Sequence, residues 1–286
     1  MKITKSFDSS SPVFYLIATP IGNRGDISLR ALEILKEADF VACEDTRNGA
    51  KLLAMYDINK PLLSVREHNE VSGAHEIVER VTNGELGAYI SDAGYPGISD
   101  PGEKLVQILV ESDIAVSVIP GASAFISALV ASGISSERFY FHGFLPPKKN
   151  ARLKEIEQLK TREETLIIYE SPHRVYESLN DLYKVLGNRS AVIARELTKL
   201  HEQYIRGQLC DLSQIEKGSL KGEIVLIIEG SHAGELRQFD EENILAKVSE
   251  LISLGLSEKD ATTYIAKYEN ISKNALRDLI YKTKVK

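Results

Sequence analysis

Short apolar runs alternate with helix-spaced segments along most of this sequence. In the first half, five runs have the length and composition of buried strands: Val13–Thr19, Phe40–Ala42, Ala88–Ser91, Val116–Ile119 and Phe139–Phe141. Between them apolar residues recur at helical spacing, as at Leu29, Leu32, Ile34 and Leu35 and again at Leu105, Val106, Leu109 and Val110. Strands that alternate with helices form largely parallel sheets that those helices cover. The pattern predicts an α/β domain over residues 12–143.

The second half repeats this alternation after a break. The segment 144–150 contains Pro146 and Pro147, interrupts the periodicity and is the expected linker. A second α/β domain is predicted over residues 144–230, with strands at Thr165–Tyr169, Ala191–Arg195, Gln203–Gly207 and Ile224–Ile228 and helices at Arg152–Leu159 and Arg174–Val185. Because few residues separate the last two strands, we expect them to form an antiparallel pair or an edge. Two domains also suit a chain of 286 residues, which is long for one core.

The C-terminal part, residues 240–286, is predicted to be a small all-helical module. Its expected helices are Glu241–Leu254, Ser257–Tyr268 and Ser272–Tyr281, with Ser257 and Ser272 as N-caps and Gly255 after the first helix. Three short helices joined by tight turns resemble a helix-turn-helix module. Such a module serves either nucleic-acid contact or the stabilisation of a dimer.

Composition excludes several classes of protein. Apolar residues at 43% and charged residues at 27% are typical of a globular chain and not of a disordered one. The two cysteines are far apart, which gives no support to a disulfide framework or a zinc site. Residues 1–11 lack the form of a signal peptide, and no apolar run approaches the ~20 residues that cross a bilayer. We therefore expect a cytoplasmic protein with no membrane partner and no metal.

Three loops follow predicted strands and precede predicted helices. The loop 91–102 is the least ordinary, because three Gly, two Pro and two Asp in twelve residues specify a rigid segment suited to ligand binding. In it Asp92 could accept hydrogen bonds from a ligand, whereas Asp100 is expected to cap the next helix. The loops 19–26 and 120–124 are individually compatible with ordinary turns. Since ligands collect at the carboxyl ends of strands in α/β sheets, the three loops together predict a binding site.

Charged stretches are expected at the same sheet edge. They are Glu44-Asp45-Thr46-Arg47, Glu67-His68-Asn69-Glu70, Tyr169-Glu170-Ser171-Pro172-His173-Arg174, Arg195-Glu196-Leu197-Thr198-Lys199 and Lys221-Gly222-Glu223. His68, between two acids, is a candidate base or RNA contact, although an isolated histidine is more often structural. The stretches in the second half could equally be ion-pair networks.

Taken in order from about Phe14 to Gly230, these motifs resemble the tetrapyrrole methylase superfamily and, within it, its branch of small-subunit rRNA (cytidine-2'-O)-methyltransferases. The resemblance implies two α/β domains, a homodimer, and S-adenosylmethionine held in the cleft between the domains. Two positions depart from the branch pattern: Tyr95, where Thr is common, and Arg66, where His is common. The implied cofactor contacts are Pro20, Asp92, Ala93, Gly94, Ile98, Ser123, Ala124, Tyr169, Leu197, Glu223 and Ile224.

The activity that this resemblance implies is methyl transfer to the ribose 2'-hydroxyl of a cytidine in the decoding region of 16S rRNA. Such a hydroxyl is a weak nucleophile, so a proton acceptor is useful. The expected acceptors, among which the sequence does not choose, are Glu44, Asp45, Glu67, His68 and Glu170. A tetrapyrrole C-methyltransferase and a non-enzymatic rRNA-binding assembly factor remain as alternatives, and the intact Asp92-Ala93-Gly94 stretch disfavours the second.

RNA contact by a chain of net charge −6 requires basic residues to be concentrated locally. Residues 146–160 hold five basic and two acidic side chains, and residues 257–286 hold seven and four. We expect these segments to grip 16S rRNA or the small ribosomal subunit. The RNA contacts expected from the motifs and the first segment are Arg24, Arg47, Lys148, Lys149, Arg152, Arg174 and Lys199.

Overall fold

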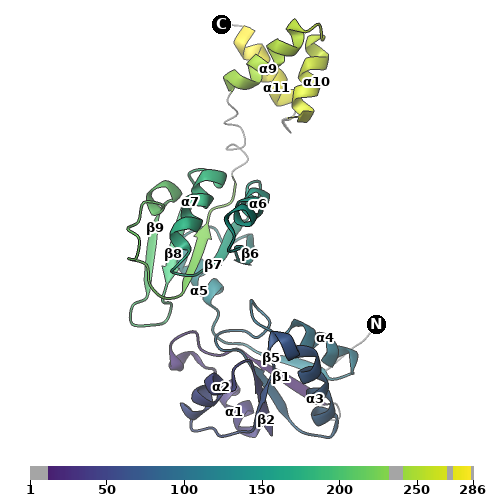
Figure 1. The fold of residues 1–286 in the computed structure, drawn as a ribbon, viewed down its shortest axis with the longest axis vertical. Helices are drawn as coiled ribbons and strands as arrows, with labels where there is room; N and C mark the ends of the chain where they lie inside the picture. The colour runs from purple at the N-terminus through teal and green to yellow at the C-terminus, as the bar shows by residue number, and fades with distance from the viewer. Residues whose placement is uncertain (1–11, 232–240, 269–272, 285–286) are drawn as a thin grey trace. The chain divides into compact units, whose positions relative to one another are not determined.

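The computed structural model describes residues 12–231, 241–268 and 273–284 (Figure 1). The chain divides into two compact units, Met1–Gly230 and Ser231–Lys286. The first unit contains two five-stranded sheets, and the second is helical. The α/β class and the helical C-terminal part are as predicted.

The first sheet is entirely parallel, with the strand order β3-β2-β4-β1-β5. Its strands are β1 (Val13–Ile17), β2 (Phe40–Cys43), β3 (Leu62–Ser64), β4 (Gly87–Ile90) and β5 (Ala115–Ile119). Four of them match predicted runs. The fifth, β3, is only three residues long and partly buried, so its apolar signal is weak.

Helices cover both faces of this sheet. The first face carries α1 (Leu29–Glu37) and α2 (Thr46–Ala54), which share a core with the strands through residues such as Leu35 and Leu53. The other face carries α3 (Glu70–Thr82) and α4 (Glu103–Glu111). Side-chain caps fix where the first two helices begin: Ala31 N donates to Ser28 Oγ at 3.1 Å, and Arg47 N donates to Asp45 Oδ1 at 2.9 Å. Two short 3₁₀ turns, Arg24–Asp26 and Glu67–Asn69, lie in the loops.

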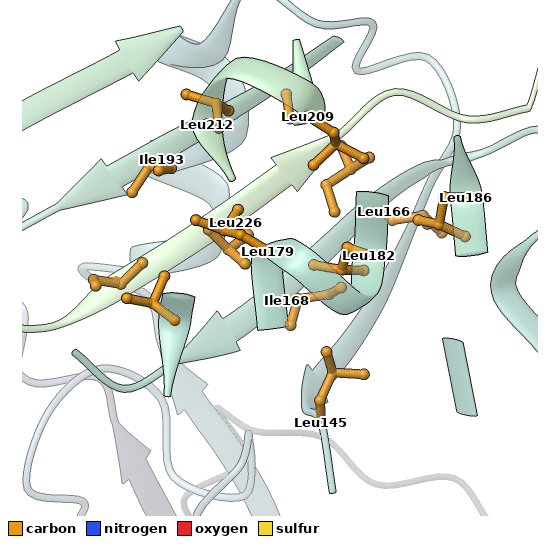
Figure 2. Packing of buried hydrophobic residues seen from close by; sticks show 14 of the residues in the cluster. Leu145, Leu166, Ile168, Leu179, Leu182, Leu186, Ile193, Leu209, Leu212 and Leu226 are labelled. Atoms are coloured by element: carbon orange, nitrogen blue, oxygen red, sulfur yellow. The ribbon is translucent and has the colours of Figure 1, made fainter. Parts of the chain in front are cut away.

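The second sheet is mixed, with the order β6-β7-β10-β8-β9. Its strands are β6 (Phe139–Phe144), β7 (Thr165–Glu170), β8 (Ser190–Arg195), β9 (Gln203–Gln208) and β10 (Ile224–Ile228), and only the pair β6–β7 is parallel. One face is covered by α6 (Lys149–Leu159), α7 (Val175–Leu186) and the short α8 (Leu209–Leu212). Figure 2 shows the leucine-rich core where α7 lies over the strands. The other face is covered by α5 (Ala124–Ser132).

Two strand placements differ from the prediction. The expected last strand of the first domain, Phe139–Phe141, is part of β6 and pairs with β7 in the second sheet, so that placement is wrong. An apolar run identifies a strand but not its partner, and here α6 supplies the crossover that a parallel pair needs. Strands β9 and β10 do not form the antiparallel pair that was one alternative, since β10 lies between β7 and β8; β9 forms the edge beside β8, as the other alternative expected.

The C-terminal unit consists of α9 (Glu241–Ser253), α10 (Glu258–Tyr268) and α11 (Lys273–Lys284) around a small apolar core. Gly255 adopts a φ of +97°, a left-handed conformation that glycine tolerates, between α9 and α10. Ser257 caps α10, since Asp260 N donates to its Oγ at 3.1 Å. The other expected cap, Ser272, lies outside the described residues. None of the described helices has the length and apolarity needed to span a membrane.

Candidate functional site

The three glycine-containing loops predicted from the sequence meet at one edge of the first sheet. Thr19 and Gly94 form a backbone bridge, with Thr19 N donating to Gly94 O at 2.8 Å and Gly94 N donating back at 3.1 Å. Gly121 N donates to the hydroxyl of Tyr95 at 3.1 Å. The loops after β1, β4 and β5 are therefore joined to one another by hydrogen bonds.

A buried carboxylate forms hydrogen bonds to the end of the loop 91–102 and to the helix that follows it. Glu70, the first residue of α3, accepts hydrogen bonds from Gly102 N at 2.9 Å and from Leu105 N at 3.1 Å. It thereby caps α4 in place of a side chain from the loop itself, and the N-cap residue Gly102 supplies none. The last residue of the Glu-His-Asn-Glu stretch is thus a positioning group, a role that residue spacing does not indicate.

A cavity of about 510 Å³ opens beside these loops, between the two sheets of the first unit. Its walls come from the loops after β1, β4, β5, β7 and β8 and from the start of β10. Nine of the expected cofactor residues line it: Ala93, Gly94, Ile98, Ser123, Ala124, Tyr169, Leu197, Glu223 and Ile224. Pro20 and Asp92 are not among the lining residues, and Asp92 is exposed and accepts a hydrogen bond from Asn48 Nδ2 at 2.7 Å.

A partly buried carboxylate, that of Asp100, lines the cavity. Burial, together with the nearby carboxylates of Glu44 and Asp92, raises the pKa of Asp100 to about 6. Burial and Asp92 likewise raise the pKa of Glu44, which follows β2. Asp100 is therefore a cavity residue and not simply the helix cap expected from the sequence; its place in the rigid loop was the available signal.

The lining of the cavity also contains an ion-pair cluster. Lys199 Nζ donates to Glu196 Oε1 at 3.0 Å and to Glu223 Oε2 at 2.9 Å. Burial lowers the pKa of Lys199, but these two hydrogen bonds more than offset it, and the net shift is upward. Its aliphatic stem lies against Gly22, where a Cβ would come within 2.5 Å of Lys199 Cγ. Lys199 thus joins the loops after β1 and β8, and its role as an RNA contact stays a prediction.

Two of the expected proton acceptors are already engaged. Asp45 forms a two-point ion pair with Arg47, and these hydrogen bonds hold its pKa well below the usual range. Glu170 is buried and accepts from Ser178 Oγ at 2.5 Å, from Ser171 N at 2.8 Å and from Arg174. Both carboxylates are therefore held by hydrogen bonds in the structure, and their role as proton acceptors stays a prediction.

The other three expected acceptors are less constrained. Glu67 and His68 are exposed on the 3₁₀ turn after β3. Glu44 is partly buried near Asp92 and Asp100 and is not among the residues that line the cavity. No group of three His, Cys, Asp or Glu side chains in the described part of the chain could hold a metal ion.

The expected RNA contacts fall into two groups. Arg24, Arg47, Lys148 and Lys149 are exposed. Arg152 is 1% exposed and forms ion pairs with Asp181 at 2.8 Å and Glu177 at 3.2 Å, which pins α6 to α7. Its assignment as an RNA contact is wrong, because a basic residue in a basic run carries no sequence mark of burial. Arg174 is partly buried against Glu170.

Known proteins resemble this chain at two levels. A family model described as Tetrapyrrole (Corrin/Porphyrin) Methylases matches residues 13–213. Two relatives are named Ribosomal RNA small subunit methyltransferase I: that of Bacillus subtilis (strain 168) is 40% identical over 280 residues, 96% of each chain. That of Pasteurella multocida (strain Pm70) is 44% identical over 268 residues, 92% of this chain and 95% of the other.

The fold also matches solved structures. The crystal structure of uroporphyrin-III-C-methyltransferase from Thermus thermophilus aligns with a TM-score of 0.55 at 17% identity, covering 76% of this chain and 94% of that one. With a family model that spans most of the first unit and relatives that span nearly the whole sequence, the chain belongs to the tetrapyrrole (corrin/porphyrin) methylase family.

Proposed function

We propose that this protein transfers a methyl group from S-adenosylmethionine to the ribose 2'-hydroxyl of a cytidine in the decoding region of 16S rRNA, in the cytoplasm. The observation that carries the proposal is a cavity lined by the expected cofactor residues in a chain with full-length relatives named as small-subunit rRNA methyltransferases. The substrate is 16S rRNA, free or in the small subunit.

The chemistry of the cavity suits this cofactor. Its volume lies in the range of small-molecule sites. The carboxylate of Asp100 favours a ligand that carries ammonium and sulfonium charges, and the two carboxylates of Glu196 and Glu223 together exceed the single charge of Lys199. Ser123, the N-cap of α5, makes no side-chain cap, so backbone N–H groups at the start of that helix are suited to a ligand carboxylate. When bound, S-adenosylmethionine supplies an electrophilic methyl group on its sulfonium.

The protein's own contribution is to position the ribose and to accept its proton. Of the three unengaged acceptors, Glu44 is favoured, because burial and neighbouring carboxylates move its pKa towards neutrality, where a general base works best. The Glu44→Gln variant keeps the shape of the side chain and removes the acceptor. We expect it to bind S-adenosylhomocysteine as the parent does and to lose roughly 10²- to 10⁴-fold in transfer rate.

We also propose a homodimer that forms through α5. This helix is largely apolar, with Ser127 and Ser132 as its polar residues, and leaves Ile126 40% and Val130 75% exposed. Phe139 on the neighbouring edge strand β6 is 41% exposed and contacts Phe125 of α5 at a ring distance of 6.5 Å. An apolar surface of this kind is typical of sites of protein association.

The deciding experiment is a map of ribose methylation. Small subunits from cells that lack this protein are incubated with the purified protein and S-adenosylmethionine, and 2'-O-methyl groups are located by mass spectrometry of rRNA digests. We expect one cytidine in the decoding region to gain a methyl group, and the Glu44→Gln protein to serve as the inactive control. Methylation of a porphyrinoid instead, or RNA binding without transfer by the parent protein, would contradict the proposal.

A further inference from the structure

Two tyrosines of the C-terminal unit are exposed side by side on α10. Tyr264 is 56% exposed and Tyr268, one turn later, is 74% exposed. Their rings are nearly parallel, with an interplanar angle of 6° and a centroid distance of 6.1 Å. Helix α10 enters the core through Ala261, Ile265 and Ala266, and neither tyrosine is among the described residues that pack against that core. The tyrosine pair therefore takes no part in the packing of this unit.

A basic side chain accompanies the pair. Lys267 lies between the tyrosines in sequence and is exposed. Of the acids nearest the pair in the sequence, Glu269 follows Tyr268 and lies outside the described residues, and Asp260 accepts a hydrogen bond from Ser257 Oγ at 2.6 Å at the start of the helix. Aromatic faces with adjacent cations match the two components of a single-stranded nucleic acid, its bases and its phosphates.

We propose that Tyr264 and Tyr268 form a stacking platform for unpaired bases of the rRNA substrate, with Lys267 beside a phosphate. This inference rests on the proposed function, which makes RNA the substrate. The bases of a duplex are already stacked on each other, so the platform selects a loop or another unpaired segment. It gives the C-terminal unit a role in recognising the substrate that is separate from the cavity.

The chain contains no tryptophan, which allows a direct test of stacking. In the full-length Tyr268→Trp protein the new indole is the only one, and a base stacked on it quenches its fluorescence. We expect quenching by a single-stranded oligonucleotide from the decoding region. We expect little quenching by the same oligonucleotide without bases or in a duplex. Binding of the single strand with unchanged fluorescence would overturn the proposal.

Affinity measurements separate stacking from charge. The Tyr264→Ala/Tyr268→Ala protein should bind the single strand about 5- to 150-fold more weakly per stacked base, with an unchanged salt slope. The Tyr264→Phe/Tyr268→Phe protein should retain parental affinity, because phenylalanine also stacks. Lys267→Ala should lower the log–log salt slope by about 0.7. Tyr183→Ala, an exposed tyrosine of α7 in the first unit, is the matched control and should change nothing.

The outcomes also distinguish this inference from the proposed function. If the double alanine protein binds RNA as the parent does, or loses its dimeric state instead, the platform is wrong while the methylation result stands. If the parent protein neither binds nor methylates rRNA, the proposed function itself fails. Unchanged binding of S-adenosylhomocysteine in the double variant verifies that the first unit is intact.

Discussion

At the scale of single residues, the cavity combines groups that weaken the fold with groups that suit a ligand. Asp100 is kept partly buried near Glu44 and Asp92, which disfavours its ionised form. A cationic ligand would relieve that repulsion. Active sites commonly contain such pKa shifts, because the arrangement that serves binding opposes the stability of the empty protein.

We predict that Asp100→Asn makes the protein more stable and its cofactor binding weaker. The pKa of Asp100 is raised to about 6, so its unfavourable ionisation is absent at low pH, half developed near pH 6 and nearly complete at pH 7.5. The free energy of unfolding of the variant should therefore exceed that of the parent at pH 7.5, by at most about 3 kcal/mol, and equal it near pH 4. Denaturant unfolding at both pH values measures this difference.

Cofactor affinity gives the complementary readout for Asp100. In the parent, affinity for S-adenosylmethionine should rise between pH 5 and pH 7 as Asp100 loses its proton. Calorimetry should find weaker binding and a flatter pH profile in the Asn variant. An unchanged profile would remove Asp100 from the site.

A second residue-scale prediction concerns Arg152. Its replacement by alanine leaves the carboxylate of Asp181, whose side chain is 5% exposed, buried without its partner. We expect a loss of about 3–5 kcal/mol in the free energy of unfolding, and recovery of most of it in Arg152→Met/Asp181→Leu. RNA affinity of the folded double variant should match the parent. A parental stability combined with weakened RNA binding would restore Arg152 as an RNA contact.

At the scale of elements, the site depends on loops that are fastened by side chains from elsewhere in the sequence. Glu70 on α3 fastens the loop 91–102 and the start of α4. Tyr95 in that loop fastens the loop before α5. The loops around the cavity are therefore held in place partly by residues of helices that do not line it, such as Glu70 of α3.

Removing the carboxylate of Glu70 tests this support. Glu70→Ala leaves two buried backbone N–H groups without an acceptor, and we expect about 1–3 kcal/mol lower stability. The affinity for S-adenosylhomocysteine should also fall. Glu67→Ala, at an exposed position of the same stretch, should affect neither property. Equal effects of the two substitutions on the calorimetric affinity would argue against the positioning role.

Helix α5 gives a prediction for the proposed homodimer. Val130→Asp places a charge on the exposed apolar surface without entering the core, since Val130 is 75% exposed. Light scattering after size-exclusion chromatography should find a monomer. Leu29→Asp, at an 80% exposed apolar position on α1, is the control and should stay dimeric. A dimeric Val130→Asp protein would place the interface elsewhere.

The sequence predicted the existence of these elements better than their partners. Strand β10 has the predicted bounds, because continuous β-branched and leucine residues between turns leave little choice. Strand β6 was recognised but assigned to the wrong sheet, since pairing depends on the crossover that follows. At the site, the motifs were sufficient to predict the small cavity-lining residues of the glycine-containing loops, such as Ala93 and Gly94. The engagement of Asp45, Glu170 and Lys199 depends on hydrogen bonds that residue spacing does not encode.

At the scale of the whole molecule, the chain has two units with separate cores, and the proposed cofactor cavity and the proposed base-stacking platform lie in different units. The cavity and its supports lie within Met1–Gly230, whereas the tyrosine platform lies within Ser231–Lys286. The acidic net charge of the chain makes local basic surfaces necessary for binding RNA. Substrate recognition and methyl transfer should therefore be separable.

Truncation after Gly230 tests this separation. Binding of S-adenosylhomocysteine should be unchanged, because the cavity is complete in the first unit. RNA affinity should fall, and the salt slope should decrease by about 0.7 for each phosphate of single-stranded RNA that the truncated protein no longer binds. If the truncated protein methylates small subunits with an unaltered salt slope, the C-terminal unit does not bind RNA.

The strand order of the first sheet also has a consequence for synthesis on the ribosome. Strand β1, of sequence Val-Phe-Tyr-Leu-Ile, emerges first, yet both of its neighbours are late: β4 and then β5. At ~5–20 residues per second, the roughly 70 residues between β1 and β4 keep β1 unpaired for roughly 4 to 14 seconds. During that interval β2 and β3 can already pair with each other. The nascent chain thus exposes an apolar strand that invites chaperone binding, and ribosome pausing before residue 90 would prolong that exposure.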